Sequence, residues 1–192
     1  ETDLFRPENT EKKYDLLFIG RINFEEKGIG YLLEAMPEII KAIPNAELGI
    51  IGGGGESDRM KCLIEKLHIG AHVELLGKKP FGELAKYLNE SKVFVMPSAW
   101  VEHFGQVTVE AMACGVPVVG TNIGGTSEIV GDTGFIVPPK DSKALADAIL
   151  KLLENKDLRA QMGRAARQRV EQNYTYEVLV DKFVKLIADV KQ

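Results

Sequence analysis

Short apolar runs alternate with longer amphipathic segments along almost the whole chain, and this alternation constrains the fold more than any other feature. Runs such as 16–19 and 93–96 have the length of buried strands, whereas 28–43 repeats its apolar residues at the spacing of one helix face. Strands that alternate with helices build βαβ units, in which the strands lie parallel. The sequence therefore predicts an α/β fold, with a Rossmann-like parallel sheet and helices on both faces.

The same pattern gives the expected order of elements. No repeat or low-complexity linker interrupts it, so we predict one domain over residues 1–192. Three helices, at 142–153, 157–172 and 176–190, are expected to end the chain. Before them we expect strands at 16–19, 46–51, 73–76, 93–96 and 116–119, helices at 28–43, 56–67, 81–88 and 105–114, and brief strands or turns at 128–130 and 134–137.

The composition excludes several classes of protein. The 192 residues are 45% hydrophobic and carry a net charge of −4 with no basic patch, so nucleic acid is not an expected partner. The chain has neither a run of ~20 apolar residues nor a signal-peptide pattern, so we expect no transmembrane segment and a cytoplasmic location. Cys62 and Cys114 lie in apolar helical patterns, which predicts reduced core thiols. Because residue 1 is Glu rather than Met, we expect a fragment of a longer protein.

Two glutamates follow the strand expected at 93–96. Glu102 lies in the next turn and Glu110 in the next helix, at the carboxyl edge of the sheet, where open α/β proteins bind ligands. Glu110 has apolar neighbours, and a buried carboxylate is costly without a partner. Each also has a simpler interpretation. Glu110 could lie on a helix surface, and Glu102 near a helix N-terminus, where the helix dipole favours an acid.

Two cations follow the first strand, at the same edge of the sheet. Arg21 can grip two phosphate oxygens and Lys27 adds a point charge, although both could also be ordinary solvated side chains. The sequence contains no Asp-x-Asp pair to hold a divalent cation, so no metal is expected. The two cations and the helix N-terminus at 104–106 would then have to neutralise an anionic ligand at this edge.

A run of four glycines, 52–55, follows the second strand. The backbone N–H groups of such a run can cradle a phosphate, as in dinucleotide-binding proteins. The position that should be a third Gly or Ala is Ser57, however, and the run follows the second strand rather than the first. A turn that needs positive φ angles explains the run equally well.

Together, these motifs resemble those of retaining glycosyltransferases of the GT-B fold, in the large family 4 of nucleotide-sugar-dependent enzymes. The resemblance rests on the spacing of Glu102 and Glu110 and on the motif at 20–28, and it covers residues 3–176. It implies a C-terminal, nucleotide-sugar-binding domain, which is one half of a GT-B fold. Residues 1–14 would cross from an acceptor-binding N-terminal domain that is absent from this chain.

The resemblance also implies residue roles. Arg21, Lys27 and Glu102 would be catalytic, with the two cations clamping the diphosphate and Glu102 contacting the donor sugar. Glu110 would accept hydrogen bonds from the ribose hydroxyls. His103 departs from the small residue or proline of the family and is expected to be a bystander. The donor-binding set would be Gly20, Arg21, Lys27, Leu76, Gly77, Lys78, Glu102, Phe104, Gly105, Gln106 and Glu110, with 76–78 facing the nucleobase.

The resemblance also suggests where one loop and two aromatic side chains lie relative to this set. The loop 122–128 would lie beside the donor. Trp100 and Phe104 would either line the site or pack in the core, which is the commoner fate of such side chains.

The implied activity is the transfer of a hexose from a nucleotide-diphosphate sugar to an acceptor, with retention of configuration, in a longer enzyme. This domain alone would bind the donor without transferring it, and no cofactor is implied beyond that substrate. Peripheral membrane association of the full enzyme is compatible with the resemblance. Two alternatives stay open. One is a dehydrogenase-type dinucleotide module that uses glycines 52–55, and the other is a non-catalytic Rossmann-like nucleotide-binding or interaction module.

Overall fold

Six parallel strands form the central sheet of the computed structural model, which describes residues 2–190. The strands are β1 (Tyr14–Ile19), β2 (Leu48–Ile51), β3 (Val73–Gly77), β4 (Ser91–Met96), β5 (Val118–Thr121) and β6 (Phe135–Val137). They lie in the order β3-β2-β1-β4-β5-β6, and each neighbouring pair is parallel. The predicted Rossmann-like sheet is therefore confirmed.

The order of the strands reverses between β1 and β4. The chain runs outward from β1 to β3 and then returns to place β4 on the other side of β1. The connections on the two sides leave in opposite directions, so a crevice opens at the carboxyl ends of these two strands. Any ligand site of this fold is expected at that edge.

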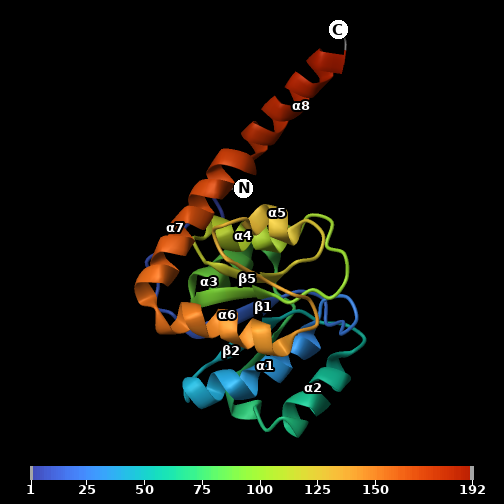
Figure 1. The fold of residues 1–192 in the computed structure, drawn as a ribbon, viewed down its shortest axis with the longest axis vertical. Coiled ribbons are helices and arrows are strands. Elements are labelled where there is room, and N and C mark those ends of the chain that lie inside the picture. Colours follow the sequence, from blue (N-terminus) through green and yellow to red (C-terminus); the bar gives the residue numbers. More distant parts are fainter. Residues whose placement is uncertain (1, 191–192) are drawn as a thin grey trace.

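Helices cover both faces of the sheet (Figure 1). Side chains alternate between the faces along each strand. The helices are α1 (Ile29–Ala42), α2 (Ser57–Lys66), α3 (Leu84–Asn89), α4 (Gln106–Ala113), α5 (Thr126–Val130), α6 (Ser142–Glu154), α7 (Lys156–Asn173) and α8 (Tyr176–Val190), with 3-10 turns η1 (Gly70–His72) and η2 (Phe81–Glu83). In β1, Leu16 and Phe18 pack under α1 and α6, whereas Leu17 and Ile19 pack under α3, α4 and α7.

Two of the expectations for local structure were wrong. Residues 128–130, expected as a strand or turn, are the end of helix α5, and Gly131 ends that helix with a φ of 55°. Cys62, expected in the core, is exposed, because α2 buries Met60 and Ile64 and so turns position 62 to the solvent. Cys114 is buried as predicted, and burial raises the pKa of its thiol to about 12.

The N-terminal segment is fastened to this domain. Phe5 is buried in the core under α4 and α7, and its carbonyl oxygen accepts a hydrogen bond from Arg167 at 2.8 Å. The side chain of Asn89 accepts from the N–H of Glu8 and donates to the carbonyl of Arg6. That residues 1–14 cross to another domain stays a prediction, and residues 1, 191 and 192 of the predicted domain lie outside the described residues.

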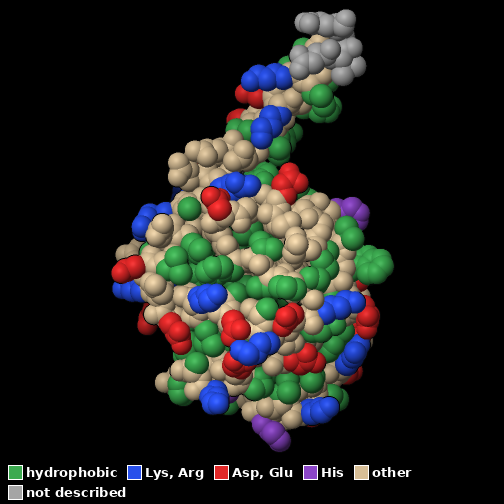
Figure 2. Space-filling view, in the orientation of Figure 1, with side chains coloured by type: hydrophobic (Ala, Val, Ile, Leu, Met, Phe, Trp, Pro, Cys, Tyr) green, Lys and Arg blue, Asp and Glu red, His purple; other side chains and the backbone are tan. Residues whose placement is uncertain are grey.

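Helix α8 extends away from the rest of the domain (Figure 1), and hydrophobic side chains reach the surface along it (Figure 2). In the described part of the chain, no helix is both long enough and apolar enough to cross a membrane. The exposed large apolar residues of α8 are Tyr176, Leu179, Val180, Phe183, Val184, Leu186 and Ile187.

Candidate functional site

Glycines allow the loops at the carboxyl edge of the sheet to pack directly on one another. Gly28 has a φ of 64°, and a Cβ there would lie 1.9 Å from the carbonyl oxygen of Pro97, in the loop after β4. Gly52 has a φ of 148°, and a Cβ there would lie 1.8 Å from the carbonyl oxygen of Gly20. A Cβ at Gly54 would lie 2.4 Å from the carbonyl oxygen of Ile22. Close packing of loops therefore explains Gly52 and Gly54, and of the four glycines only Gly52 takes the positive φ that the turn interpretation predicted.

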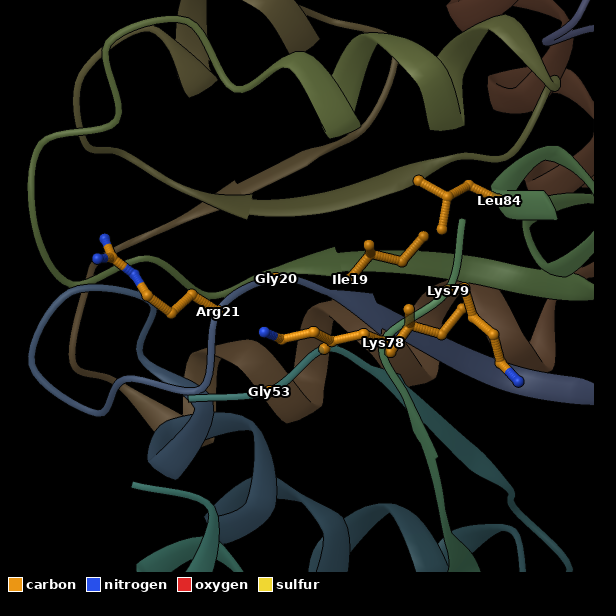
Figure 3. A pocket seen from close by; sticks show the side chains of 9 residues that line it. Ile19, Gly20, Arg21, Gly53, Lys78, Lys79 and Leu84 are labelled. Atoms are coloured by element: carbon orange, nitrogen blue, oxygen red, sulfur yellow. The ribbon is translucent and has the colours of Figure 1, made fainter. Parts of the chain in front are cut away.

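A first cavity of about 400 Å³ opens between the loops that follow β1, β2 and β3 (Figure 3). The side chain of Lys78 lies between Gly20 and Gly53 and directs its ammonium group toward Arg21, while Lys79 points the other way (Figure 3). The structure thus brings together three residues of the predicted donor set. The complete lining is Ile19, Gly20, Arg21, Ile51, Gly52, Gly53, Lys78, Lys79 and Leu84.

Lys27 and Glu102 form an ion pair, although 75 positions separate them in sequence. The Lys27 ammonium donates a hydrogen bond to Oε2 of Glu102, and the two side chains are only 22% and 19% exposed. Salt screens such a half-buried pair less than a surface pair. Two of the three predicted catalytic residues are therefore direct partners.

The third predicted catalytic residue, Arg21, is held more loosely. Its guanidinium donates to Glu26 at 2.6 Å, but the Arg21 and Glu26 side chains are 64% and 44% exposed. Exposed pairs contribute little to stability, so Arg21 can exchange this partner for a ligand at small cost.

The loop that carries Glu102 is fixed by the loop after β5. The Glu102 carbonyl oxygen accepts from the N–H of Gly125 at 2.8 Å. Gly124 has a φ of 57°, and a Cβ there would lie 2.2 Å from the same oxygen. Sequence reasoning placed 122–128 beside the donor but missed that Gly124 and Gly125 position Glu102. The adjacent glycines were the only signal for this contact.

A second cavity, of about 250 Å³, surrounds Glu110. Glu110 is 7% exposed, which rules out the surface-helix interpretation. The ring of Phe5 packs edge-on against Phe81, and that of Phe104 against Tyr174, with centroids 5.3 and 6.1 Å apart. Sequence reasoning missed Phe5, Phe81 and Tyr174 because they come from three distant segments. The lining is Phe5, Phe81, Phe104, Gln106, Val109, Glu110 and Tyr174.

Most of the predicted donor set is thus divided between the two cavities and the ion pair, whereas Leu76, Gly77 and Gly105 are not among the described lining residues. Trp100 and Phe104 are 67% and 45% exposed, so neither packs in the core, and Phe104 lines the second cavity. Leu76 packs partly buried against the core. The carbonyl oxygen of Gly77 accepts from the N–H of Gly52 at 2.9 Å. His103 is exposed.

Helix α4 begins at this edge. Gly105 precedes its first residue, Gln106, and takes the left-handed conformation with a φ of 66°. Within the described chain no side chain caps this helix. Its first N–H groups and the positive end of its dipole therefore suit an anionic ligand.

Comparison with known proteins agrees with this geometry. Residues 1–169 match the family Glycosyl transferases group 1. The chain is 34% identical over 171 residues to N-acetyl-alpha-D-glucosaminyl L-malate synthase of Bacillus anthracis, covering 88% of this chain and 44% of that protein. The chain therefore spans about half the length of the curated relatives it matches.

Solved structures give the same result. Sucrose-phosphate synthase of Thermosynechococcus elongatus is 31% identical with a TM-score of 0.87, over 99% of this chain and 50% of that one. The C-terminal domain of a glycosyl transferase group 1 family protein of Francisella tularensis is 25% identical with a TM-score of 0.83, over 92% of this chain and 98% of that one. The chain thus belongs to the glycosyl transferases group 1 family and has the fold of one half of a GT-B glycosyltransferase.

Proposed function

We propose that this chain binds a nucleoside-diphosphate sugar at the carboxyl edge of its sheet and is the donor domain of a retaining hexosyltransferase. The observation that carries the proposal is the Lys27–Glu102 ion pair, which joins the loop after β1, where Arg21 also lies, to the loop after β4, at the point where the strand order reverses. Cations for a diphosphate and a carboxylate for sugar hydroxyls are thereby held at one place.

The proposed chemistry is loss of the diphosphate from the anomeric carbon of the sugar, followed by attack of the acceptor from the same face. Negative charge grows on the leaving diphosphate. Arg21, Lys27 and the N-terminus of α4 would stabilise that charge more strongly as it develops, which lowers the barrier. Glu102 would orient the sugar, and Glu110 would accept hydrogen bonds from the ribose in the second cavity.

The acceptor site belongs to the part of the enzyme outside this chain in our proposal, because the chain spans about half the length of its relatives. We therefore expect the chain alone to bind the donor and not to transfer the sugar. Retention of configuration rests on the Glu102 and Glu110 motif.

Thermal unfolding with UDP, GDP and ADP tests the proposal. One of the three should stabilise the chain, by ~2.7 kcal/mol at ~100 times its dissociation constant. The same stabilisation is expected with EDTA present, because cationic side chains occupy the role of a metal ion. NADH is the control for a dinucleotide module and should have no effect. Stabilisation that requires magnesium or manganese would contradict the metal-independent clamp, and no stabilisation by any diphosphate would contradict the proposal.

A further inference from the structure

A third cavity, of about 240 Å³, opens at the opposite edge of the sheet. It lies at the amino ends of the strands, because Ser91 begins β4 and Pro117 immediately precedes β5. The length of the strands separates it from the candidate donor site. We call it the basic cavity, and it is lined by Lys12, Ser91, Lys92, Gly115, Val116, Pro117, Lys156, Arg159 and Ala160.

Positive charge is concentrated in this cavity. Four of the described residues that line it, Lys12, Lys92, Lys156 and Arg159, are cations, and none is an acid. Lys92 is neutralised by Asp15 at 2.6 Å. The positive charges of Lys12, Lys156 and Arg159 remain in the cavity, although the chain as a whole carries a net charge of −4. Like charges gathered in one hollow repel one another, and an anion that joins them relieves this repulsion.

Hydrogen bonds hold two of these cations in place. The Lys12 ammonium donates to the carbonyl oxygen of Asn89 at 2.6 Å, and the Arg159 guanidinium donates to the carbonyl oxygens of Leu152 and Leu153 at 2.9 and 3.1 Å. A lysine has three N–H donors and an arginine five, so both keep donors for a ligand. Fixed donors lose little entropy when a ligand binds.

The two fixed cations are also partly removed from water. Burial lowers the pKa of Lys12, and Arg159 lowers it further, while Cys114 raises it. Burial likewise lowers the pKa of Arg159, against the raising effect of Asp15. Lys156 begins α7, a helix of 18 residues, so the positive end of its dipole adds to the field. A bound anion would offset the burial of the Lys12 and Arg159 charges and would be attracted by the positive end of the α7 dipole.

We propose that the basic cavity is a second anion site, which binds a phosphate group through Lys12, Lys156 and Arg159. A phosphate dianion matches three cations and several N–H donors better than a single carboxylate does. The group has two sources, a soluble phosphate compound or the headgroup of an anionic lipid. The site is separate from the proposed donor site, since no described residue lines both.

Amide NMR on the whole chain, titrated with inorganic phosphate at constant ionic strength, tests the site. Saturable shifts are expected for Gly115, Val116, Lys156 and Ala160. The pair Lys12→Gln and Lys156→Gln should weaken this binding at least about tenfold, because two charge-assisted bonds are lost. The pair Lys61→Gln and Lys66→Gln on α2 is the matched control, since it removes the same charge from exposed positions, and should change nothing. Arg21→Ala should also leave these shifts intact, which separates this site from the donor site.

Flotation with vesicles distinguishes the two sources. If the headgroup is the ligand, the unmodified chain and the α2 control pair will float with vesicles of phosphatidylcholine and phosphatidic acid, and the Lys12→Gln, Lys156→Gln pair will not. If a soluble compound is the ligand, the NMR shifts will appear and flotation will be the same for every variant. The proposal is overturned if the shifts are absent and flotation does not depend on these lysines, or if the shifts persist unchanged in the double variant.

Discussion

At the residue scale, Arg21 offers the sharpest test of the diphosphate clamp. Its partner in the structure is an exposed acid, Glu26, so its removal should not disturb the fold. Arg21→Ala should weaken binding of the nucleoside diphosphate by about 1.5–3 kcal/mol, the range for a charged hydrogen bond. Calorimetry with the diphosphate and with the nucleoside checks this. The nucleoside should bind as before, and equal losses for both ligands would indicate a general defect instead.

The two glutamates should respond in opposite ways. Glu110 lines the second cavity, so Glu110→Gln should weaken binding of the diphosphate, and a 2′-deoxy or 3′-deoxy nucleotide should be less sensitive to the change. Glu102 instead competes for Lys27. Glu102→Gln should therefore raise diphosphate affinity, by up to about fivefold, or roughly 1 kcal/mol. Calorimetry on both variants decides it, and a loss of diphosphate affinity in Glu102→Gln would refute this division of roles.

At the element scale, the contact between two loops should matter as much as the side chains they carry. Gly124 combines a left-handed backbone with close approach to the Glu102 carbonyl. Gly124→Ala should therefore destabilise the chain by about 1–3 kcal/mol. Gly82→Ala is the control, because a Cβ at that position meets no atom within 4 Å, and it should stay within about 0.5 kcal/mol. Urea unfolding measures both, and equal effects would argue against the contact.

The sequence was sufficient to predict the helices and strands, but it was not sufficient to predict the contacts between them. The hydrophobic period predicted β1 to β5 and left 134–137 as a strand or a turn. It worked best for β1, β2, β4 and β5, because burial on both faces makes a strand a nearly continuous apolar run. It did not predict which side of α2 faces the solvent, so Cys62 was misplaced. Phe5 and Tyr174 were missed in the second cavity because their proximity arises only when the N-terminal segment and the end of α7 pack on α4. The Lys27–Glu102 pair likewise joins two loops that are distant in sequence, and these loops approach closely where Gly28 lies against Pro97.

At the scale of the whole molecule, we expect α8 to decide whether this chain associates in solution. Its large apolar side chains are exposed along most of its length, and such surfaces associate. Deleting residues 176–192 should leave the unfolding midpoint and diphosphate binding unchanged, because none of the described residues of α8 lines the two cavities at the carboxyl edge. The shortened chain should remain monomeric in light scattering at concentrations where the full chain associates. Identical masses for the two chains would contradict this prediction.

The Lys27–Glu102 pair has a consequence for product release. In the resting domain each charge is the counterion of the other. A diphosphate that recruits Lys27 leaves the Glu102 carboxylate in need of donors, and the hydroxyls of an intact sugar supply them. The nucleoside diphosphate product carries no sugar, so no sugar hydroxyl replaces Lys27 as a donor to Glu102. We expect the sugar nucleotide to bind more tightly than the diphosphate, with the difference vanishing in Glu102→Gln, and calorimetry can measure both. Product inhibition of such a domain would be weak, because Lys27 and Glu102 pair with each other again once the sugar has left.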